Sequence, residues 1–116
     1  MYTDSHAHLY LEDFAVDRDP MIRRAIDRGV SRMFLPNIDT GTIPSLLQLV
    51  EDYPLNCYPM LGLHPTSVKE DYREQLDLIG SYLKREDIIA IGETGIDLYW
   101  DKTYLMQQVE LSLIHI

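Results

Sequence analysis

Two histidines spaced two residues apart, His6 and His8, lie in the segment TDSHAHL near the N-terminus. Side chains at this spacing point to the same face of a strand, and Asp4 shares the spacing. Two imidazoles on one face can hold a divalent cation, and a nearby carboxylate can orient a ligating ring. Two hydrogen-bonded histidines in a core or on a surface produce the same pattern. The pair alone therefore leaves metal binding and packing open.

A glutamate between two glycines is the second chemical signal. Glu93, in the segment GETGID, directly follows an apolar strand pattern and lies between Gly92 and Gly95. Glycine lets the backbone bend, so that a carboxylate can approach a crowded centre. A carboxylate beside imidazoles suits a divalent hydrolytic metal. Glu93 could therefore hold or bridge metal ions, with Asp97 in support; the alternative is an acid that caps a turn or helix.

Other polar and aromatic side chains follow predicted strands and carry weaker signals. His64, in GLHP, could contact a substrate phosphate or transfer a proton, or could pack at the turn that Pro65 fixes. Asn37, in PNIDTG, is typical of an ordinary turn. Tyr99 and Trp100 could stack on a nucleic-acid base, although packing against the following helix is the stronger interpretation.

These residues lie near the ends of strands in an alternating pattern of strands and helices. Strands are predicted at about residues 2–9, 31–38, 55–65 and 87–97, and helices at about 20–29, 43–53, 71–84 and from 102 onward. For the first helix we expect Asp19 as N-cap, Pro20 at the first position and Gly29 at the end. Residues 88–91 are nearly all apolar, which predicts helices on both faces of a parallel sheet.

Four successive β-α units predict an α/β fold, either a doubly wound open sheet or a (β/α)8 barrel. Active sites of barrels lie at the C-terminal ends of the strands, where His6, His8, His64 and Glu93 are expected. No GxGxxG motif or P-loop follows the first strand, which disfavours the nucleotide-binding open sheet. Because a complete barrel needs about 250 residues, these 116 residues are predicted to form the N-terminal half of a (β/α)8 TIM barrel.

Composition limits the partners and the compartment. The formal net charge of −9 disfavours nucleic-acid binding through a basic patch, so any such substrate would have to be attracted through bound cations or a local cluster. Cys57 is the only cysteine, which fits a reducing compartment. No signal-peptide pattern and no apolar run of about 18 residues occurs. We expect a cytoplasmic protein with no membrane association and no obligate protein partner.

Taken together and in this order, TDSHAHL, GLHP and IGETGID closely resemble the TatD family of metal-dependent deoxyribonucleases, which are hydrolases with a TIM-barrel fold. The resemblance runs from residue 1 to about residue 110. It implies that His6 and His8 are metal ligands, that Glu93 holds or bridges the metals, and that His64 contacts the substrate. It also implies one or two divalent ions, Mg²⁺, Mn²⁺ or Zn²⁺, as cofactors.

The activity implied by this resemblance is cleavage of DNA phosphodiester bonds, in the manner of an exonuclease acting on single-stranded or frayed DNA. Bound metals would lower the pKa of water and stabilise the attacking and leaving oxygens. One alternative is hydrolysis of another bond, such as an amide, lactone, phosphotriester or aminoacyl ester. Another alternative is a non-catalytic, truncated fragment.

The sequence departs from the family pattern in two places. Tyr10 stands where many members carry an acidic residue, and we expect little effect on the metals. The family continues for more than this length again, adding two histidine ligands and the aspartate expected to be the general base, so no catalytic residue is assigned here. A half barrel would have unpaired outer strands, and we expect it to be inactive alone or at best a dimer that completes the barrel.

The domain prediction is therefore a barrel half at residues 1–110 followed by a non-native tail at residues 111–116. This tail, LSLIHI, resembles a translated sequencing adapter. His115, within it, comes too early to match the next histidine ligand of the family.

Overall fold

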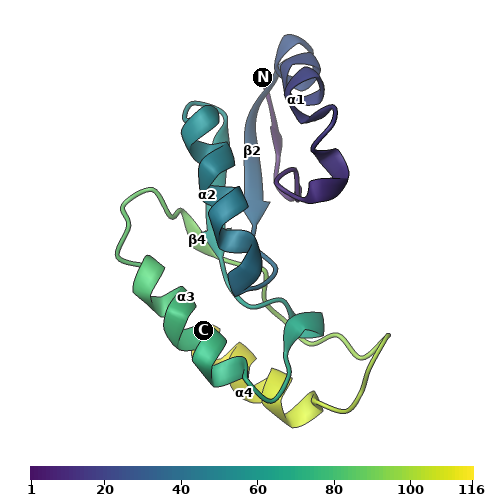
Figure 1. Ribbon diagram of the computed structural model, residues 1–116, viewed down its shortest axis with the longest axis vertical. Coiled ribbons are helices and arrows are strands. Elements are labelled where there is room, and N and C mark those ends of the chain that lie inside the picture. Colours follow the sequence, from purple (N-terminus) through teal and green to yellow (C-terminus); the bar gives the residue numbers. More distant parts are fainter.

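The sheet consists of four parallel strands that lie side by side in chain order, β1-β2-β3-β4. The computed structural model describes all 116 residues. Its helices and strands are β1 (Tyr2–Asp4), α1 (Arg18–Asp27), β2 (Val30–Pro36), α2 (Ile43–Asp52), β3 (Cys57–Leu61), α3 (Tyr72–Tyr82), β4 (Ala90–Ile91) and α4 (Leu105–His115). Figure 1 shows this succession, which is the curled, half-barrel α/β fold predicted from the β-α alternation.

The first helix begins earlier than predicted. Arg18 is its first residue and Asp17 is the N-cap, so Asp19 and Pro20 both lie inside the first turn. Proline is tolerated there because the first N–H groups of a helix have no intrahelical acceptor. The predicted end is close to the observed one: Gly29 follows the helix with a φ of 89°, a left-handed conformation that glycine adopts without a steric penalty.

The strands are shorter than predicted. β1 ends at Asp4 and β4 has two residues, so His6, His8 and Glu93 lie in loops just beyond the strand ends. Beyond β1, the N–H of His6 donates to the Asp4 carboxylate at 3.1 Å, and the N–H of Ala7 still donates to the carbonyl of Phe34 in β2 at 3.1 Å. The predicted location at the C-terminal edge of the sheet is nevertheless correct.

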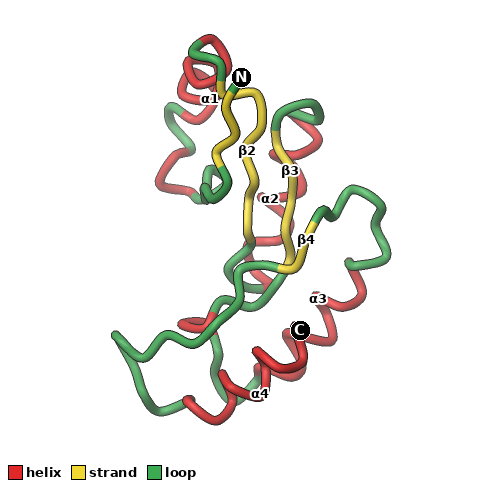
Figure 2. The backbone as a smooth tube through the Cα atoms, turned by 180° about the vertical axis from the view of Figure 1, so that it is seen from behind, coloured by secondary structure: helices red, strands yellow, loops and turns green.

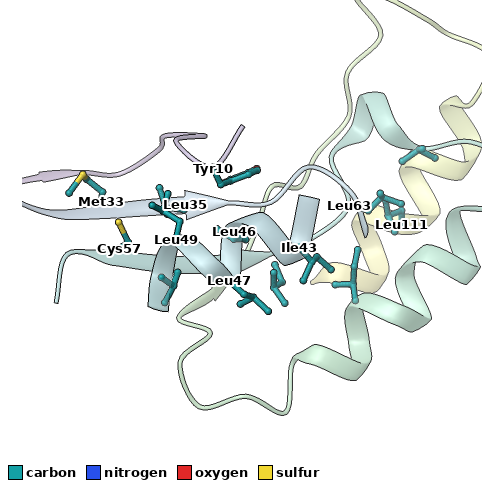
Figure 3. Packing of buried hydrophobic residues seen from close by; sticks show 14 of the residues in the cluster. Tyr10, Met33, Leu35, Ile43, Leu46, Leu47, Leu49, Cys57, Leu63 and Leu111 are labelled. Carbon is teal, nitrogen blue, oxygen red and sulfur yellow. The ribbon is translucent and has the colours of Figure 1, made fainter. Parts of the chain in front are cut away.

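The hydrophobic core lies between the sheet and the helices on one of its faces. Met33 and Leu35 of β2 are buried, whereas Phe34 between them is only half-buried, which follows the alternation of side chains along a strand. Leu46 of α2 packs in the same cluster (Figure 3). Figures 1 and 2 view the molecule from opposite sides, and α2 lies in front of the strands in one and behind them in the other. This side of the sheet carries the core.

The outer strands are exposed. All three residues of β1 are exposed, and Ile89 and Ile91 beside the other edge of the sheet are 44% and 39% exposed. The prediction that helices cover both faces of this strand is therefore wrong for this chain, because Ala90 and Ile91 are both exposed and adjacent side chains of a strand point to opposite faces. None of the helices is long and apolar enough to cross a membrane.

The last helix runs through the segment predicted to be a non-native tail. Leu111 is buried in the core, and Nε2 of His115 accepts a hydrogen bond from the N–H of Leu63 at 3.4 Å. The origin of residues 111–116 stays a prediction.

We expect Leu35→Ala to lower the free energy of unfolding by about 2–5 kcal/mol, because the substitution removes a fully buried side chain and leaves a cavity. Urea denaturation followed by far-ultraviolet circular dichroism measures this loss. Leu55→Ala is the matched control, since Leu55 is 81% exposed and its loss should change stability by less than about 0.5 kcal/mol. Equal effects of the two substitutions would contradict the burial of Leu35 in the core.

Candidate metal centre

The side chains of His6, His8 and Glu93 converge at the C-terminal edge of the sheet. The Nε2 atoms of His6 and His8 lie 3.1 Å apart, and Oε2 of Glu93 lies 3.1 Å from the first and 3.3 Å from the second. One candidate ligand atom from each residue thus falls within 4.8 Å of the other two. The two strongest chemical signals of the sequence, far apart along the chain, are neighbours in space.

The chemistry of these atoms fits a divalent cation. Oε2 of Glu93 is buried and has no hydrogen-bond partner. A buried carboxylate oxygen without a donor costs free energy through lost hydration, and a cation would offset that cost. Two imidazole nitrogens and one carboxylate oxygen form a ligand set typical of zinc and related metals. His6, His8 and Glu93 could therefore hold a metal ion.

The hydrogen bonds of His8 define which of its ring nitrogens faces Glu93 with a lone pair. Its Nδ1 lies 3.0 Å from the carbonyl oxygen of Pro36, which can only accept, so Nδ1 carries the proton and Nε2 is free. Burial is the main cause that lowers the pKa of His8 and favours its neutral form, which a metal ligand requires.

Tyr10 supports the same ring. Its hydroxyl donates to the Pro36 carbonyl at 2.6 Å and lies 2.9 Å from Nδ1 of His8. The residue is almost fully buried, and burial raises the pKa of Tyr10 above its usual range, so the phenol remains a donor. From the sequence Tyr10 was a departure of little consequence for the metals, whereas in the structure it contacts a candidate ligand directly.

His64 lies on the opposite side of the Glu93 carboxylate. Its Nδ1 accepts a hydrogen bond from the N–H of Thr66 at 3.1 Å, which leaves the proton on Nε2. This Nε2 lies 3.0 Å from Oε1 of Glu93. His64 thus caps the turn Pro65–Ser67 and also orients the glutamate, so that one carboxylate oxygen faces His64 and the other faces the histidine pair.

Asn37 connects the strand ends that carry these residues. It is fully buried, and its Oδ1 accepts a hydrogen bond from the N–H of Gly62 at 2.7 Å. Its main-chain carbonyl accepts from the N–H of Glu93 at 3.3 Å. The sequence indicated only an ordinary turn here. The signal that could have identified Asn37 is its position directly after an apolar strand, where a buried amide needs partners from neighbouring strands.

Gly62 is a second residue that the sequence did not single out. A Cβ atom at this position would lie 2.7 Å from the carbonyl oxygen of Glu93 and 2.9 Å from the carbonyl carbon of Gly92, closer than real contacts allow. The glycine in GLHP therefore permits the Glu93 loop to pass directly over the end of β3.

Two acids predicted to support the site have other roles. Asp4 accepts from the backbone N–H of His6 at 3.1 Å rather than from an imidazole ring. Asp97 accepts from the backbone N–H of Tyr99 at 2.8 Å, and its own backbone is bonded to Gln108. Asp97 thus shapes the loop after Glu93 rather than supporting the Glu93 carboxylate.

A half-barrel with imidazole and carboxylate groups at the C-terminal ends of its strands is the architecture of metal-dependent TIM-barrel hydrolases. The sequence matches the family described as TatD related DNase over residues 3–116. The chain belongs to this family, as its three motifs predicted.

Curated relatives and a solved structure agree with this assignment. The chain is 34% identical over 103 residues to the uncharacterized metal-dependent hydrolase YabD of Bacillus subtilis, covering 89% of this chain and 40% of YabD. It is 31% identical over 94 residues to the 3'-5' ssDNA/RNA exonuclease TatD of Erwinia tasmaniensis, covering 81% and 36%. The crystal structure of YJJV, a TatD homolog from Escherichia coli K12, superposes with a TM-score of 0.78 at 29% identity, covering 95% and 43%. The chain thus spans about two fifths of the length of these relatives.

Gly62→Ala is expected to weaken binding of a divalent metal at least about tenfold, because the added methyl group displaces the backbone of Glu93. Titration calorimetry with Zn²⁺ or Mn²⁺ measures the affinity. Gly80→Ala is the matched control, since a Cβ atom at Gly80 meets nothing within 4 Å and should leave metal affinity unchanged. Wild-type affinity in the Gly62 variant would show that the close approach does not matter.

Tyr10→Phe removes the hydroxyl group beside Nδ1 of His8 and keeps the ring. We expect a fall in metal affinity of about tenfold, the lower end of the range for groups that orient a ligand, because the Pro36 carbonyl still holds the imidazole. The same calorimetric titration measures the change, and thermal unfolding without metal checks that the variant is folded. An unchanged affinity would assign Tyr10 to packing alone.

Proposed function

We propose that His6, His8 and Glu93 bind one divalent metal ion or share two, and that this centre serves hydrolysis of phosphodiester bonds in nucleic acid. The observation that carries the proposal is the convergence of two imidazole nitrogens on a buried carboxylate oxygen that has no hydrogen-bond donor. Relatives named metal-dependent hydrolases support the metal. Relatives named 3'-5' ssDNA/RNA exonuclease TatD, and a putative deoxyribonuclease of Danio rerio at 30% identity, support nucleic acid as the substrate.

The metal would supply Lewis-acid polarisation of the phosphoryl oxygens and a lowered pKa for attacking water. The protein's own residues prepare this chemistry. His6, His8 and the Oε2 atom of Glu93 would be ligands. His64 orients Glu93 through its protonated Nε2, which lies 3.0 Å from Oε1 of that residue, and it would donate to a substrate phosphate oxygen by turning this Nε2 away from Glu93.

The ligand chemistry also bears on the choice of metal. Magnesium prefers a shell of oxygen ligands and retains several waters, whereas imidazole nitrogens suit zinc well. A set of two histidines and one glutamate therefore favours Zn²⁺ over Mg²⁺. Bound cations would also reverse the local potential of a chain with net charge −9 and so attract phosphate.

His6→Ala and Glu93→Gln are expected to weaken metal binding by more than about a hundredfold, beyond the range for groups that only orient a ligand. His115→Gln is the matched control, because His115 lies outside the centre and accepts its hydrogen bond from Leu63. Calorimetric titration of this chain with Zn²⁺ and Mn²⁺ measures the affinities. Tight binding that survives both substitutions would refute the ligand assignment.

Hydrolysis is tested separately with labelled single-stranded DNA and with ester and amide substrates. We expect metal-dependent DNA cleavage by an extended chain in which residues 1–110 are followed by the rest of a (β/α)8 barrel of the length that the relatives have. The inactivity of the 116 residues alone stays a prediction, and the same assay on both chains tests it. Turnover of amides or esters without cleavage of DNA would overturn nucleic acid as the substrate.

A further inference from the structure

Tyr99 and Trp100 are two large aromatic residues exposed in the loop between β4 and α4. They are 82% and 79% exposed, and their rings contact each other edge to face with centroids 4.7 Å apart. Packing against the helix, the stronger interpretation from the sequence, is therefore wrong. The loop extends away from the sheet at the edge of the molecule (Figure 2). Two adjacent exposed aromatic side chains, one of them an indole, offer a flat apolar surface of the kind that is enriched at contacts with ligands and partners.

The buried side-chain amide of Gln108 fixes the start of this loop. Gln108 of α4 is 3% exposed; its Nε2 donates to the carbonyl of Asp97 at 3.0 Å, and its Oε1 accepts from the N–H of Asp97 at 2.9 Å. The Asp97 carboxylate in turn accepts from the N–H of Tyr99. The backbone leading to Trp100 therefore has three fixed hydrogen bonds.

Trp100 lines a small open cavity with a volume of about 80 Å³. Thr66, Lys69, Asp97 and Tyr104 are among the other residues of this Trp100 cavity. Sites for small ligands measure roughly 300–1,000 Å³. The Trp100 cavity is well below that range, so it has room only for the edge of a flat ring system whose face lies on the exposed indole.

One imidazole separates the Trp100 cavity from the candidate metal centre. Nδ1 of His64 bonds to Thr66, whose hydroxyl oxygen lies 2.7 Å away, and Thr66 lines the cavity. Nε2 of the same ring lies 3.0 Å from Glu93. A ligand in the cavity would therefore lie beside a phosphate bound at the metal centre.

The charges of the cavity favour a neutral ligand. Asp97 and Asp101 oppose a single cation, Lys69, whose Nζ lies 3.6 Å from the Asp101 carboxylate and 5.2 Å from the centre of the Tyr104 ring. A phosphate would meet a net negative charge here. A nucleobase carries no charge, can stack on an indole, and can donate N–H groups to the carboxylate oxygen of Asp97 that Tyr99 leaves free.

We propose that one nucleobase of the substrate strand stacks on the exposed indole of Trp100, with one edge in the Trp100 cavity, next to the phosphodiester at the metal centre. The inference rests on the proposed function, because it takes nucleic acid to be the substrate. It adds a base-binding site to the proposed metal centre. Stacking on Trp100, rather than hydrogen bonding to a particular base, would supply most of the affinity at this site. We therefore expect the chain to show little sequence preference.

Trp100 is the only tryptophan of the chain, so its fluorescence reports the cavity directly. The metal-free 116-residue chain is titrated with a single-stranded DNA trinucleotide and with an abasic trinucleotide, in about 0.15 M salt to screen long-range repulsion. We expect saturable quenching by the first and none by the second. Absence of quenching, or equal quenching by both, would overturn the proposal.

Variants provide an independent measurement through the anisotropy of the labelled trinucleotide. Trp100→Ala should weaken binding by roughly tenfold or more, and Trp100→Phe should retain most of it, since phenylalanine still stacks. Leu55→Ala, at an exposed site outside the cavity, is the control. Binding by Trp100→Ala as tight as wild type would refute the stacking role.

Hydrolysis by the extended chain separates the two proposals. Cleavage of DNA without quenching overturns the base-binding site alone. Quenching without cleavage leaves the base-binding site supported and overturns the proposed function. His6→Ala is expected to abolish cleavage and to leave the quenching of Trp100 unchanged.

Discussion

The position of the Glu93 carboxylate depends on hydrogen bonds that tie together the ends of three parallel strands. Asn37, directly after β2, accepts from the N–H of Gly62 after β3 and from the N–H of Glu93 after β4. Its burial makes these bonds energetically important, because an unsatisfied buried amide costs about 1–3 kcal/mol. The absence of a side chain at Gly62 then lets the backbone of Glu93 lie close above it. Without this geometry the glutamate would not reach His6 and His8.

Within the metal centre, neighbouring groups fix the tautomer of His8 and the orientation of the Glu93 carboxylate. The Pro36 carbonyl and the hydroxyl of Tyr10 fix the tautomer of His8, and burial keeps its ring neutral. His64 engages one oxygen of Glu93 and leaves the other buried without a donor. The result is a buried carboxylate oxygen that accepts no hydrogen bond and lies 3.1 and 3.3 Å from two imidazole nitrogens. A cation is the simplest chemical partner for such an arrangement, and it would reconcile an acidic chain with a phosphate-bearing substrate.

The one-sided core explains the exposed surface of the molecule. Helices pack on one face of the sheet, and both outer strands have an unpaired edge. Apolar residues near the last strand, including Ile89 and Ile91, are exposed for this reason. The exposed aromatic residues of the following loop differ from them, because Gln108 and Asp97 fix the backbone that carries Trp100. Exposure at an open sheet edge and exposure on a constrained loop therefore call for different explanations.

The sequence alone determined the succession of β-α units, the helices near their observed limits, and three motifs whose order predicted the family. These features follow from local periodicity, proline and glycine positions, and residue chemistry. Only the tertiary structure decided how the motifs meet: that His64 orients Glu93, that Tyr10 contacts His8, and that Asn37 connects the strand ends. It also decided that β4 is exposed and that Trp100 lines a cavity. Burial, tautomer and contact depend on residues distant along the chain, so no local pattern could specify them.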